Sequence, residues 1–433
     1  MTTADQIQAE LENYTLPALA HALPADEFVM PHYGGLGIAN LPTTIAALLG
    51  AELPGACPPL RRDLLAGWGN DIQRIILVVF DALGYHQLCS AMQADDRLVF
   101  HRLAQIGSMA PIASVFPSTT CTVLTTLWTG YAPAAHGSLA FEVFLRELGT
   151  AASLLFFWPI GHRQRDSLAA WGIEPAKFIP VRGLAERLSA QGIDTHSVMD
   201  KAYANSLFTQ ALQRGVQETT GFVSISDMWL SVQRALEKHR GKKLFLSVYG
   251  GTIDGITHQH SPVDPSWQLE LRLLSQAMEE GFLSCLTDAQ RKGTLLLITA
   301  DHGGVTTLPQ DAIQLKHHPD LHNALTMPPL GESRVPFLYT RSDTLEWSRS
   351  YMQERLGRSF VTLTRQQVLD GGLLGSGPLY AETPHRLGDL IAVARGGHYL
   401  ARDDQQLKMM GRHGGLSAQE MLVPLIGVRL DAL

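Results

Sequence analysis

The chain has few of the features that mark secreted, membrane-spanning or nucleic-acid-binding proteins. Only four of its 433 residues are cysteines, and they are too scattered for a disulfide framework or a CxxC metal site. No apolar run reaches the roughly 18 residues that a membrane span needs. The N-terminal segment carries acidic residues where a signal peptide needs basic ones. These absences predict a cytoplasmic protein without a membrane partner.

Charge is also sparse. Charged residues make up 17% of the chain, which argues against long disordered tracts, and 45% hydrophobic residues are enough for a sizeable core. The 34 lysines and arginines are outnumbered by 41 aspartates and glutamates, so no basic excess indicates a nucleic-acid partner. Histidine is abundant, with 17 residues, and its placement carries the functional argument. The oligomeric state stays open.

Short apolar runs separated by helical stretches predict the fold class. The run Ile75–Phe80 is too short and too rich in β-branched residues for a helix, and is typical of a parallel strand buried on both faces. Similar runs occupy 244–254, 294–304 and 423–430. Helical stretches, for example 180–191 and 267–289, lie between them. This alternation predicts an α/β fold with a mostly parallel sheet between helices.

The composition changes along the chain and divides it into parts. Residues 1–70 are predicted to form an N-terminal extension packed on the core, and 71–310 with 407–433 the catalytic core. Residues 311–406 are rich in proline, glycine and histidine, with short strand-like pieces, and are predicted to form a smaller inserted subdomain. A further insertion at about 142–200 is expected to cover the mouth of the site.

Three aspartates, each placed after an apolar strand, give the first functional signal. They are Asp81, Asp254 and Asp301. Ligands of open α/β sheets bind outside the carboxyl ends of the strands. A single aspartate in this position is commonly a helix cap. Three together, two of them accompanied by histidine, indicate a metal site instead.

Histidines complete the ligand set. His302 directly follows Asp301, His258 lies four residues after Asp254, and His413 lies in a glycine-rich turn before the last predicted strand. Three carboxylates with three imidazoles suit Zn²⁺ and tolerate Mn²⁺ or Fe. Six ligands exceed one tetrahedral site but fit two adjacent ones, and two-metal sites most often serve phosphoryl transfer.

A candidate nucleophile lies at the start of a predicted helix. The segment VFPSTTCT leads into this helix, and backbone N–H groups at a helix N-terminus attract an anion. Ser118, Thr119 and Thr120 are all competent N-caps as well, so this segment alone fits either role.

The motifs FDALG, FPSTT followed by TGYAPAAHG, DGITH, ADHGG and RHGG span residues 80–415 in this order. The set resembles the alkaline phosphatase superfamily, most closely its nucleotide pyrophosphatase/phosphodiesterase branch. The resemblance implies an alkaline-phosphatase-like core with an inserted cap subdomain. It implies two metal ions with these ligands: Asp81, Thr120, Asp301 and His302 for one, and Asp254, His258 and His413 for the other. Thr120 is the implied nucleophile, because the family places it three residues after the proline, here Pro117.

The resemblance also implies an activity. The expected enzyme is a hydrolase with two Zn²⁺ that cleaves phosphodiester or pyrophosphate bonds of a small molecule through a phosphothreonine intermediate. The family's asparagine, which steadies the transferring phosphate, is missing after His136. Lys201 and Arg146 are candidates to hold the phosphate in its place. No arginine lies between Thr120 and Arg146, which favours a diester over a monoester dianion.

Several alternatives remain. A phosphonoacetate-type phosphonate hydrolase shares all seven metal-site positions, and a phosphomonoesterase of the same superfamily is a further possibility. Phosphoglycerate mutase of the same superfamily uses a serine where Thr120 stands, which argues against a mutase. The segment after Cys121 lacks the proline and arginine of the sulfatase motif, which excludes a sulfatase. A metal-stabilised binding protein without turnover is the non-enzyme alternative. The histidines of 317–322 are expected in a surface or rim loop.

Overall fold

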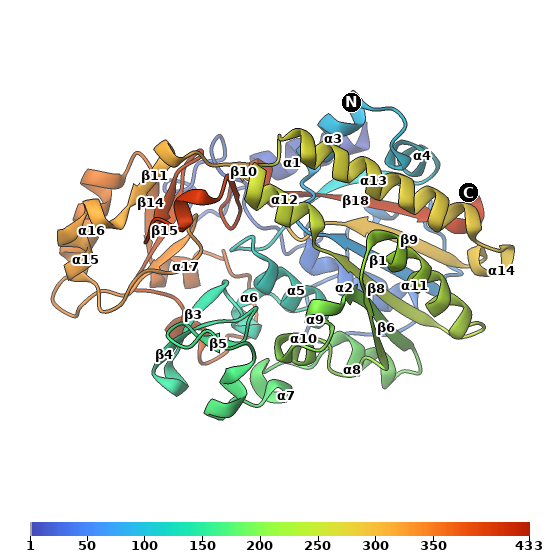
Figure 1. Cartoon of the computed structure of the whole chain (residues 1–433), viewed down its shortest axis with the longest axis horizontal. Helices are drawn as coiled ribbons and strands as arrows, with labels where there is room; N and C mark the ends of the chain where they lie inside the picture. The colour runs from blue at the N-terminus through green and yellow to red at the C-terminus, as the bar shows by residue number, and fades with distance from the viewer. Residues whose placement is uncertain (1) are drawn as a thin grey trace.

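The structure is a computed structural model that describes residues 2–433. Seven strands form its first sheet: β1 (Arg74–Phe80), β2 (Ser108–Ala113), β6 (Asp194–Asp200), β7 (Glu218–Phe222), β8 (Leu244–Gly250), β9 (Thr294–Thr299) and β18 (Leu422–Arg429). Their order is β2-β18-β9-β1-β8-β6-β7. The strands β9, β1, β8, β6 and β7 are parallel, and β18 runs antiparallel to both of its neighbours. The predicted mostly parallel sheet is therefore confirmed (Figure 1).

Helices cover both faces of this sheet. One face carries α2 (Leu41–Leu48), α5 (Thr120–Thr129), α8 (Leu184–Ser189) and α10 (Leu207–Leu212). The other carries α3 (Tyr85–Ala94), α4 (Val99–Ile106), α11 (Ile225–Lys238) and α13 (Pro265–Gly281). All seven residues of β1 are buried, because this central strand is covered on both sides. Within residues 2–433, no helix is long and apolar enough to cross a membrane.

A second sheet lies beside the first and is antiparallel throughout. Its order is β14-β15-β13-β12-β3-β4-β5. The strands are β3 (Glu142–Leu145), β4 (Thr150–Ser153), β5 (Trp158–Pro159), β12 (Leu330–Gly331), β13 (Pro336–Leu338), β14 (Phe360–Thr364) and β15 (Leu390–Ala394). Four helices belong to the same part of the chain: α15 (Pro319–Ala324), α16 (Leu345–Leu356), α17 (Arg365–Asp370) and α18 (Thr383–Arg386).

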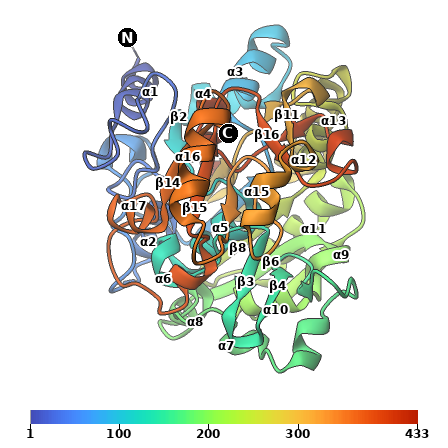
Figure 2. The ribbon, with the colours of Figure 1, turned by 90° about the vertical axis from the view of Figure 1, so that its left-hand side faces the viewer.

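This second sheet joins two segments that the sequence presented as separate insertions. Gly331 of β12 pairs with Glu142 of β3, so strands of 142–159 continue the sheet built by 330–394. The strands involved have only two to five residues, too few for a periodic signal. The predicted domain boundaries stay predictions, while strands of both segments share one sheet, of which β3, β4, β14 and β15 are labelled in Figure 2.

The N-terminal segment packs against the core. It begins with α1 (Thr3–Asn13), and Gly37 forms a parallel bridge with Ala113 at the edge strand β2. The Ala113 amide donates to the Leu36 carbonyl, at 2.8 Å, and the Val29 amide donates to the Leu416 carbonyl, also at 2.8 Å. This segment therefore extends the sheet region rather than standing apart from it.

The remaining elements are short and lie in the connections between those already given. They are α6 (Pro133–His136), α7 (Pro175–Phe178), α9 (Lys201–Ala204), α12 (Thr252–His260), α14 (Asp288–Arg291), α19 (Ala418–Met421), β10 (Val305–Thr306), β11 (Ala312–Gln314), β16 (Tyr399–Ala401) and β17 (Gly411–Arg412). The helices α5 and α12 lie where the first sheet faces the cap (Figure 1). The carboxyl ends of the parallel strands meet at this boundary.

Candidate metal centre and nucleophile

The three aspartates come together because their strands are neighbours. Asp81 directly follows β1, Asp301 lies two residues after β9, and Asp254 is on α12, which begins two residues after β8. Since β1 pairs with both β8 and β9, the three carboxylates reach the same edge of the sheet. The Asp81 amide donates to the Gly250 carbonyl at 2.9 Å, and the Ala82 amide donates to Asp301 Oδ1 at 3.2 Å.

A first group of potential ligands comprises Asp81, Asp301 and His302. His302 Nε2 lies 3.4 Å from Asp81 Oδ1 and 3.5 Å from Asp301 Oδ2. The Thr120 hydroxyl lies 3.3 Å from the same nitrogen. On the opposite side of the ring, His302 Nδ1 is 2.9 Å from the Gly303 carbonyl oxygen, which places the proton on Nδ1. The Nε2 lone pair is therefore directed at the two carboxylates and Thr120.

A second group comprises Asp254, His258 and His413. Asp254 Oδ1 lies 3.3 Å from His258 Nε2 and 3.8 Å from His413 Nε2. The Nδ1 atoms of both histidines face backbone carbonyls, of Gly411 at 2.9 Å and of Ser118 at 3.2 Å. All three histidines of the two groups are thus oriented alike, with Nδ1 donating to the backbone and Nε2 free to bind a metal.

The two groups adjoin. The rings of His302 and His413 stack with their centroids 3.6 Å apart and their planes 15° from parallel. One ring belongs to each group, so two ions held by these residues would be neighbours. All seven predicted ligand positions therefore converge on one place, and their roles as ligands stay predictions.

The polar atoms at the centre fit divalent cations. Asp81 Oδ1, Asp254 Oδ1 and Asp301 Oδ2 are buried, and none has a hydrogen-bond partner within residues 2–433. Burying carboxylate oxygens without donors is costly. These oxygens face imidazole lone pairs, and an acceptor opposite an acceptor is favourable only with a cation between them. The arrangement therefore suits the Zn²⁺, Mn²⁺ or Fe predicted from the donor types.

The pKa values of these residues are shifted by the same imbalance. Burial raises the pKa of Asp81 well above its ordinary value, and the charges of Asp301 and Asp254 raise it further. Burial also raises the pKa of Asp301, to about 7. His413 has its pKa lowered well below the ordinary value by burial and by neighbouring His302 and His258. Such shifts gather at functional sites, where ionised groups need a bound partner.

Thr120 is the first residue of α5, and capping does not explain its hydroxyl. The N-cap residue is Thr119, whose side chain makes no capping hydrogen bond and donates instead to Glu332 Oε1, at 2.7 Å. The Ser118 hydroxyl donates to the Gly415 carbonyl at 2.8 Å. The Thr120 hydroxyl alone faces the candidate metal ligands, so the structure separates it from its two neighbours.

A family model described as type I phosphodiesterase / nucleotide pyrophosphatase matches residues 75–416. The chain belongs to this family. The hydrolase class and the alkaline phosphatase superfamily expected from the motifs are thereby confirmed. No curated protein sequence matches the chain in a sequence comparison.

Solved structures of low sequence identity share the fold. Human ectonucleotide pyrophosphatase/phosphodiesterase 5 is 18% identical, with a TM-score of 0.64 over 82% of this chain and 88% of that one. The murine protein is 17% identical, with a TM-score of 0.61 over the same shares, and its inactive threonine-to-alanine variant was solved with AMP. Phosphonoacetate hydrolase from Sinorhizobium meliloti 1021 is 16% identical, with a TM-score of 0.58 over 82% of this chain and 93% of that one.

Two residues of this phosphodiesterase-family site were not predicted from the sequence. The Tyr249 hydroxyl donates to Asp81 Oδ2, and Glu332 accepts from Thr119 and from the Phe141 amide, at 2.8 Å. Burial raises the pKa of Glu332 to about 7. Strand periodicity could have placed Tyr249 on the sheet face that leads to the site. Glu332 gave no comparable signal, because its loop is far from Thr119 in sequence.

The two candidates to replace the family's phosphate-binding asparagine lie away from Thr120. The exposed Arg146 forms an ion pair with Glu382, at 2.6 Å. Lys201 is exposed at the start of α9 and lines neither cavity that reaches Thr120. The histidines of 317–322 belong to none of the potential metal groups found within residues 2–433, and His318 contacts the Tyr351 hydroxyl instead, at 2.9 Å.

A third group of potential ligands lies at the opposite edge of the first sheet. His196, Glu218 and His239 lie close together there. His239 Nδ1 lies 3.0 Å from Asp194 Oδ2, His239 Nε2 lies 3.4 Å from His196 Nδ1, and His196 Nε2 lies 2.8 Å from the Thr220 hydroxyl. These hydrogen bonds give every ring nitrogen of the two histidines a partner. Burial lowers the pKa of His196 to about 4. Hydrogen bonding alone accounts for this group.

Two cavities flank the nucleophile. One, of about 350 Å³, extends beneath α5, and the other, of about 370 Å³, faces the cap sheet. Both are lined by Thr120, Asp254 and Leu155. Two separate spaces therefore open from the same hydroxyl.

Proposed function

We propose that this chain hydrolyses phosphodiesters of small molecules with Thr120 as the nucleophile and two divalent ions, preferably Zn²⁺. The observation that carries this proposal is the Thr120 hydroxyl, free of any capping role, 3.3 Å from His302 Nε2 at the place where the two ligand groups adjoin. A purely structural metal site has no need of a hydroxyl there. The ions would be held by Asp81, Asp301, His302 and Thr120, and by Asp254, His258 and His413.

When bound, the ions would lower the pKa of the attacking oxygen and neutralise charge on the equatorial phosphate oxygens. Thr120 Oγ1 forms a bond to phosphorus while the bond to the leaving oxygen breaks, and the hydroxyl proton passes to solvent. The first turn of α5 presents backbone N–H groups to the resulting charge. The intermediate is a phosphothreonine that still carries the second ester substituent. Water then replaces the Thr120 oxygen and completes the hydrolysis.

The two cavities support a diester as substrate. A diester has two substituents on phosphorus, and two cavities open at Thr120. A monoester dianion needs an additional cation, but Arg402, which lines the second cavity, already forms an ion pair with Glu142 at 2.5 Å. We therefore rank phosphodiesters above phosphomonoesters. Pyrophosphates of nucleotides and phosphonates, named for the similar structures, are the alternatives.

Matched isosteric variants test the nucleophile. Thr120→Val removes the attacking oxygen, and Thr122→Val makes the same change two residues along α5, where the Thr122 hydroxyl is buried without a hydrogen-bond partner. We expect kcat for bis-(p-nitrophenyl) phosphate to fall by about 10³-fold or more in Thr120→Val. Thr122→Val should retain wild-type activity, since losing an unpaired buried hydroxyl costs little.

Metal content is measured on the same samples by elemental analysis. Thr120→Val should keep divalent ions, because Asp81, Asp301 and His302 still offer ligands. A Thr120→Val enzyme with full metal content and near-wild-type turnover would overturn the proposal. Equal losses in both variants would indicate damage to α5 rather than loss of a nucleophile.

A further inference from the structure

We propose that the cavity beneath α5 binds an apolar substituent of the substrate, so the preferred diesters carry an alkyl, acyl or aryl chain. This inference rests on the proposed phosphodiesterase function and names its substrate class. The cavity has about 350 Å³, within the roughly 300–1,000 Å³ typical of small-molecule sites. Ordinary protein interiors contain few voids larger than a water molecule, so this space is not a packing defect.

The floor of the cavity is one face of the first sheet. Alternate residues of three neighbouring strands line it: Leu77 and Val79 of β1, Phe245, Ser247 and Tyr249 of β8, and Ser197 and Met199 of β6. This period of two is that of side chains pointing to the same side of a sheet. The cavity therefore follows the sheet inward from the carboxyl ends where the metal ligands lie.

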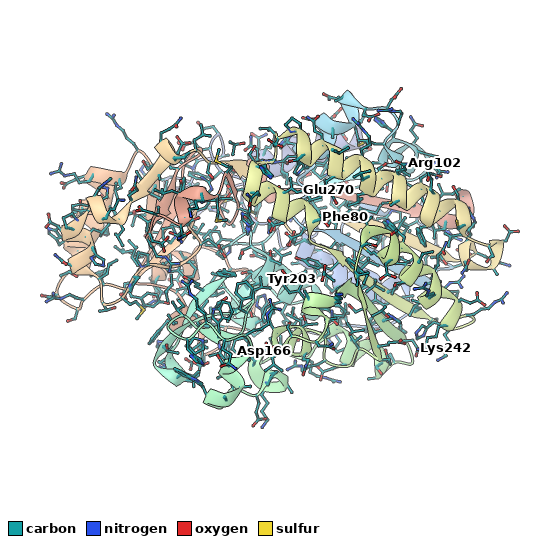
Figure 3. The ribbon with its side chains drawn as sticks, viewed as in Figure 1. Phe80, Arg102, Asp166, Tyr203, Lys242 and Glu270 are labelled. Carbon is teal, nitrogen blue, oxygen red and sulfur yellow. The ribbon has the colours of Figure 1, made fainter. Side chains whose placement is uncertain are left out.

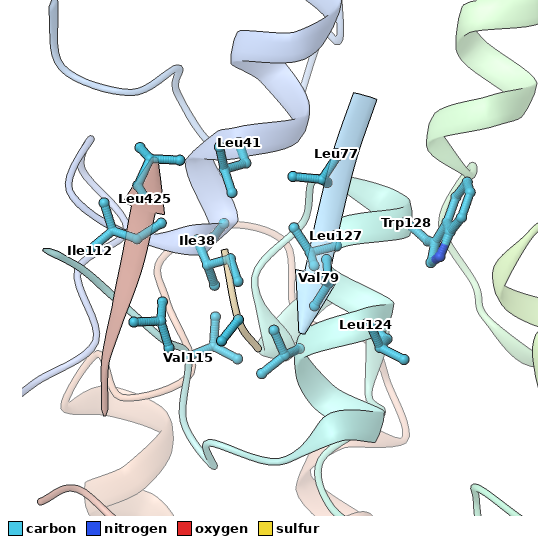
Figure 4. Close-up of a cluster of buried hydrophobic side chains, with 14 of the residues drawn as sticks. Ile38, Leu41, Leu77, Val79, Ile112, Val115, Leu124, Leu127, Trp128 and Leu425 are labelled. Carbon is cyan, nitrogen blue, oxygen red and sulfur yellow. The ribbon is translucent and has the colours of Figure 1, made fainter. Parts of the chain in front are cut away.

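The roof begins at the nucleophile. Leu124, Leu127 and Trp128 lie four, seven and eight residues after Thr120 in α5, and this spacing places them on one helix face. Figure 4 shows these three side chains together with Leu77 and Val79 of β1. At 1.5 Å per residue, seven residues of helix carry the cavity about 10 Å inward from Thr120. Leu124 and Trp128 keep 8% and 6% of their surface exposed.

Four polar side chains of the wall are already paired with one another or with Thr219. Gln213 donates to the Ser197 hydroxyl at 2.9 Å and accepts from the Thr219 hydroxyl at 3.0 Å. The Ser206 hydroxyl donates to that of Thr209 at 3.0 Å. Hydroxyls and amides satisfied in this way offer little to a sugar or a peptide. An apolar occupant, in contrast, needs no such partners.

Charge in the wall excludes an anionic occupant. Of the residues the structure describes, no lysine or arginine lines this cavity. Its charged residues are Asp81 and Asp254 at the metal ligands, and Asp200, which accepts from the Ala202 amide at the start of α9. With ions bound at Asp81 and Asp254, Asp200 is the charge that remains in this wall, so additional phosphates of a pyrophosphate would meet like charge and no counter-charge here. Tyr203 lies at the same end, where α9 approaches the cap (Figure 3).

A series of alkyl p-nitrophenyl phosphates, from methyl to hexyl, tests the inference with the zinc-loaded enzyme. Each methylene that leaves water for an apolar site is worth about a fourfold gain in affinity. Allowing for incomplete burial, we expect kcat/KM to rise at least about tenfold from methyl to hexyl. Leu127→Trp, which fills the cavity, should abolish this chain-length dependence. Leu230→Trp makes the same substitution on an exposed site of α11, 42% exposed, and should preserve it.

A binding measurement separates this inference from the proposed function. Titration calorimetry with methyl- to hexylphosphonate measures binding to the cavity without turnover. The affinity should rise with chain length in the wild type but not in Leu127→Trp. If diesters are hydrolysed but neither kcat/KM nor binding affinity depends on chain length, the inference is overturned and the proposed function still stands. Binding that depends on chain length, without hydrolysis of any diester, would support the inference about the cavity and overturn the proposed function. If Leu127→Trp does not fold, Leu127→Ala should shift the preference to longer chains.

Discussion

The buried ion pair between Arg334 and Glu420 connects the cap to the metal centre. Both side chains are fully buried and form two hydrogen bonds, of 2.9 and 2.7 Å. Arg334 also donates to the carbonyls of Gly396 and His398, at 2.7 and 2.6 Å. Glu420 accepts from the Gly415 amide at 2.8 Å, in the loop that follows the predicted ligand His413.

Glu420→Gln keeps the shape of the side chain and leaves the Arg334 charge buried without a counterion. Breaking a buried pair in this way costs about 3–5 kcal/mol. A chain of 433 residues has an unfolding entropy of about 0.9 kcal/mol/K, so this loss lowers Tm by about 3–6 °C. Differential scanning calorimetry of metal-free protein measures the shift. Zinc affinity should also fall, because the loop that positions His413 loses an anchor.

The loss should depend on pH in a defined direction. Burial opposes ionisation of Glu420, but Arg334 and the Ser417 hydroxyl outweigh it, so the pKa of Glu420 lies below its ordinary value of 4.5. A carboxyl with a lowered pKa stabilises the fold above its unfolded pKa, and this contribution disappears as the pH falls through the folded value. The difference between wild type and Glu420→Gln should therefore be full at pH 7 and shrink below about pH 4.5.

The double variant Arg334→Met with Glu420→Leu is the control. Replacing both charges with apolar groups of similar volume removes the uncompensated charge, so it should be more stable than Glu420→Gln. A Tm shift under about 1 °C for Glu420→Gln, or a double variant less stable than the single one, would refute the reasoning.

Three further results are expected. Elemental analysis should find about two divalent ions per chain, and after chelation Zn²⁺ should restore activity better than Mg²⁺, because three of the ligands are imidazoles; a single ion after zinc loading would contradict this. Bis-(p-nitrophenyl) phosphate should have a higher kcat/KM than p-nitrophenyl phosphate under the same metal loading, and a clear monoester preference would reverse the argument from Arg402. Tyr249→Phe leaves Asp81 Oδ2 without its donor and should lower zinc affinity about 10- to 100-fold in a chelator competition, whereas unchanged affinity would make Tyr249 dispensable.

Local patterns in the sequence were enough to predict the central strands and the residues that meet at their ends. The strand β1 is an unbroken apolar run, and Asp81 follows it directly, so topology alone brings Asp81 beside Asp301. Strand β6 was missed, because its sequence DTHSVMD mixes polar with apolar residues. Two of its buried polar residues are satisfied by partners distant in sequence, Thr220 for His196 and Gln213 for Ser197.

The cap and the outer parts of the site depend on contacts that no local pattern records. The pairing of Gly331 with Glu142 spans almost 200 residues, and it brings Glu332 against Thr119. The cavity beneath α5 likewise requires residues of four strands and four helices to be in place. Motif order was sufficient for the family, whereas the shape of the substrate site required the assembled structure.

The stereochemical course at phosphorus tests the central claim most directly. A covalent intermediate on Thr120 requires two displacements, each of which inverts the configuration. A chiral phosphorothioate diester, hydrolysed in isotopically labelled water and analysed by ³¹P NMR, should therefore give a product with net retention. Net inversion would mean a single displacement by water, and it would contradict the role of Thr120 as the nucleophile.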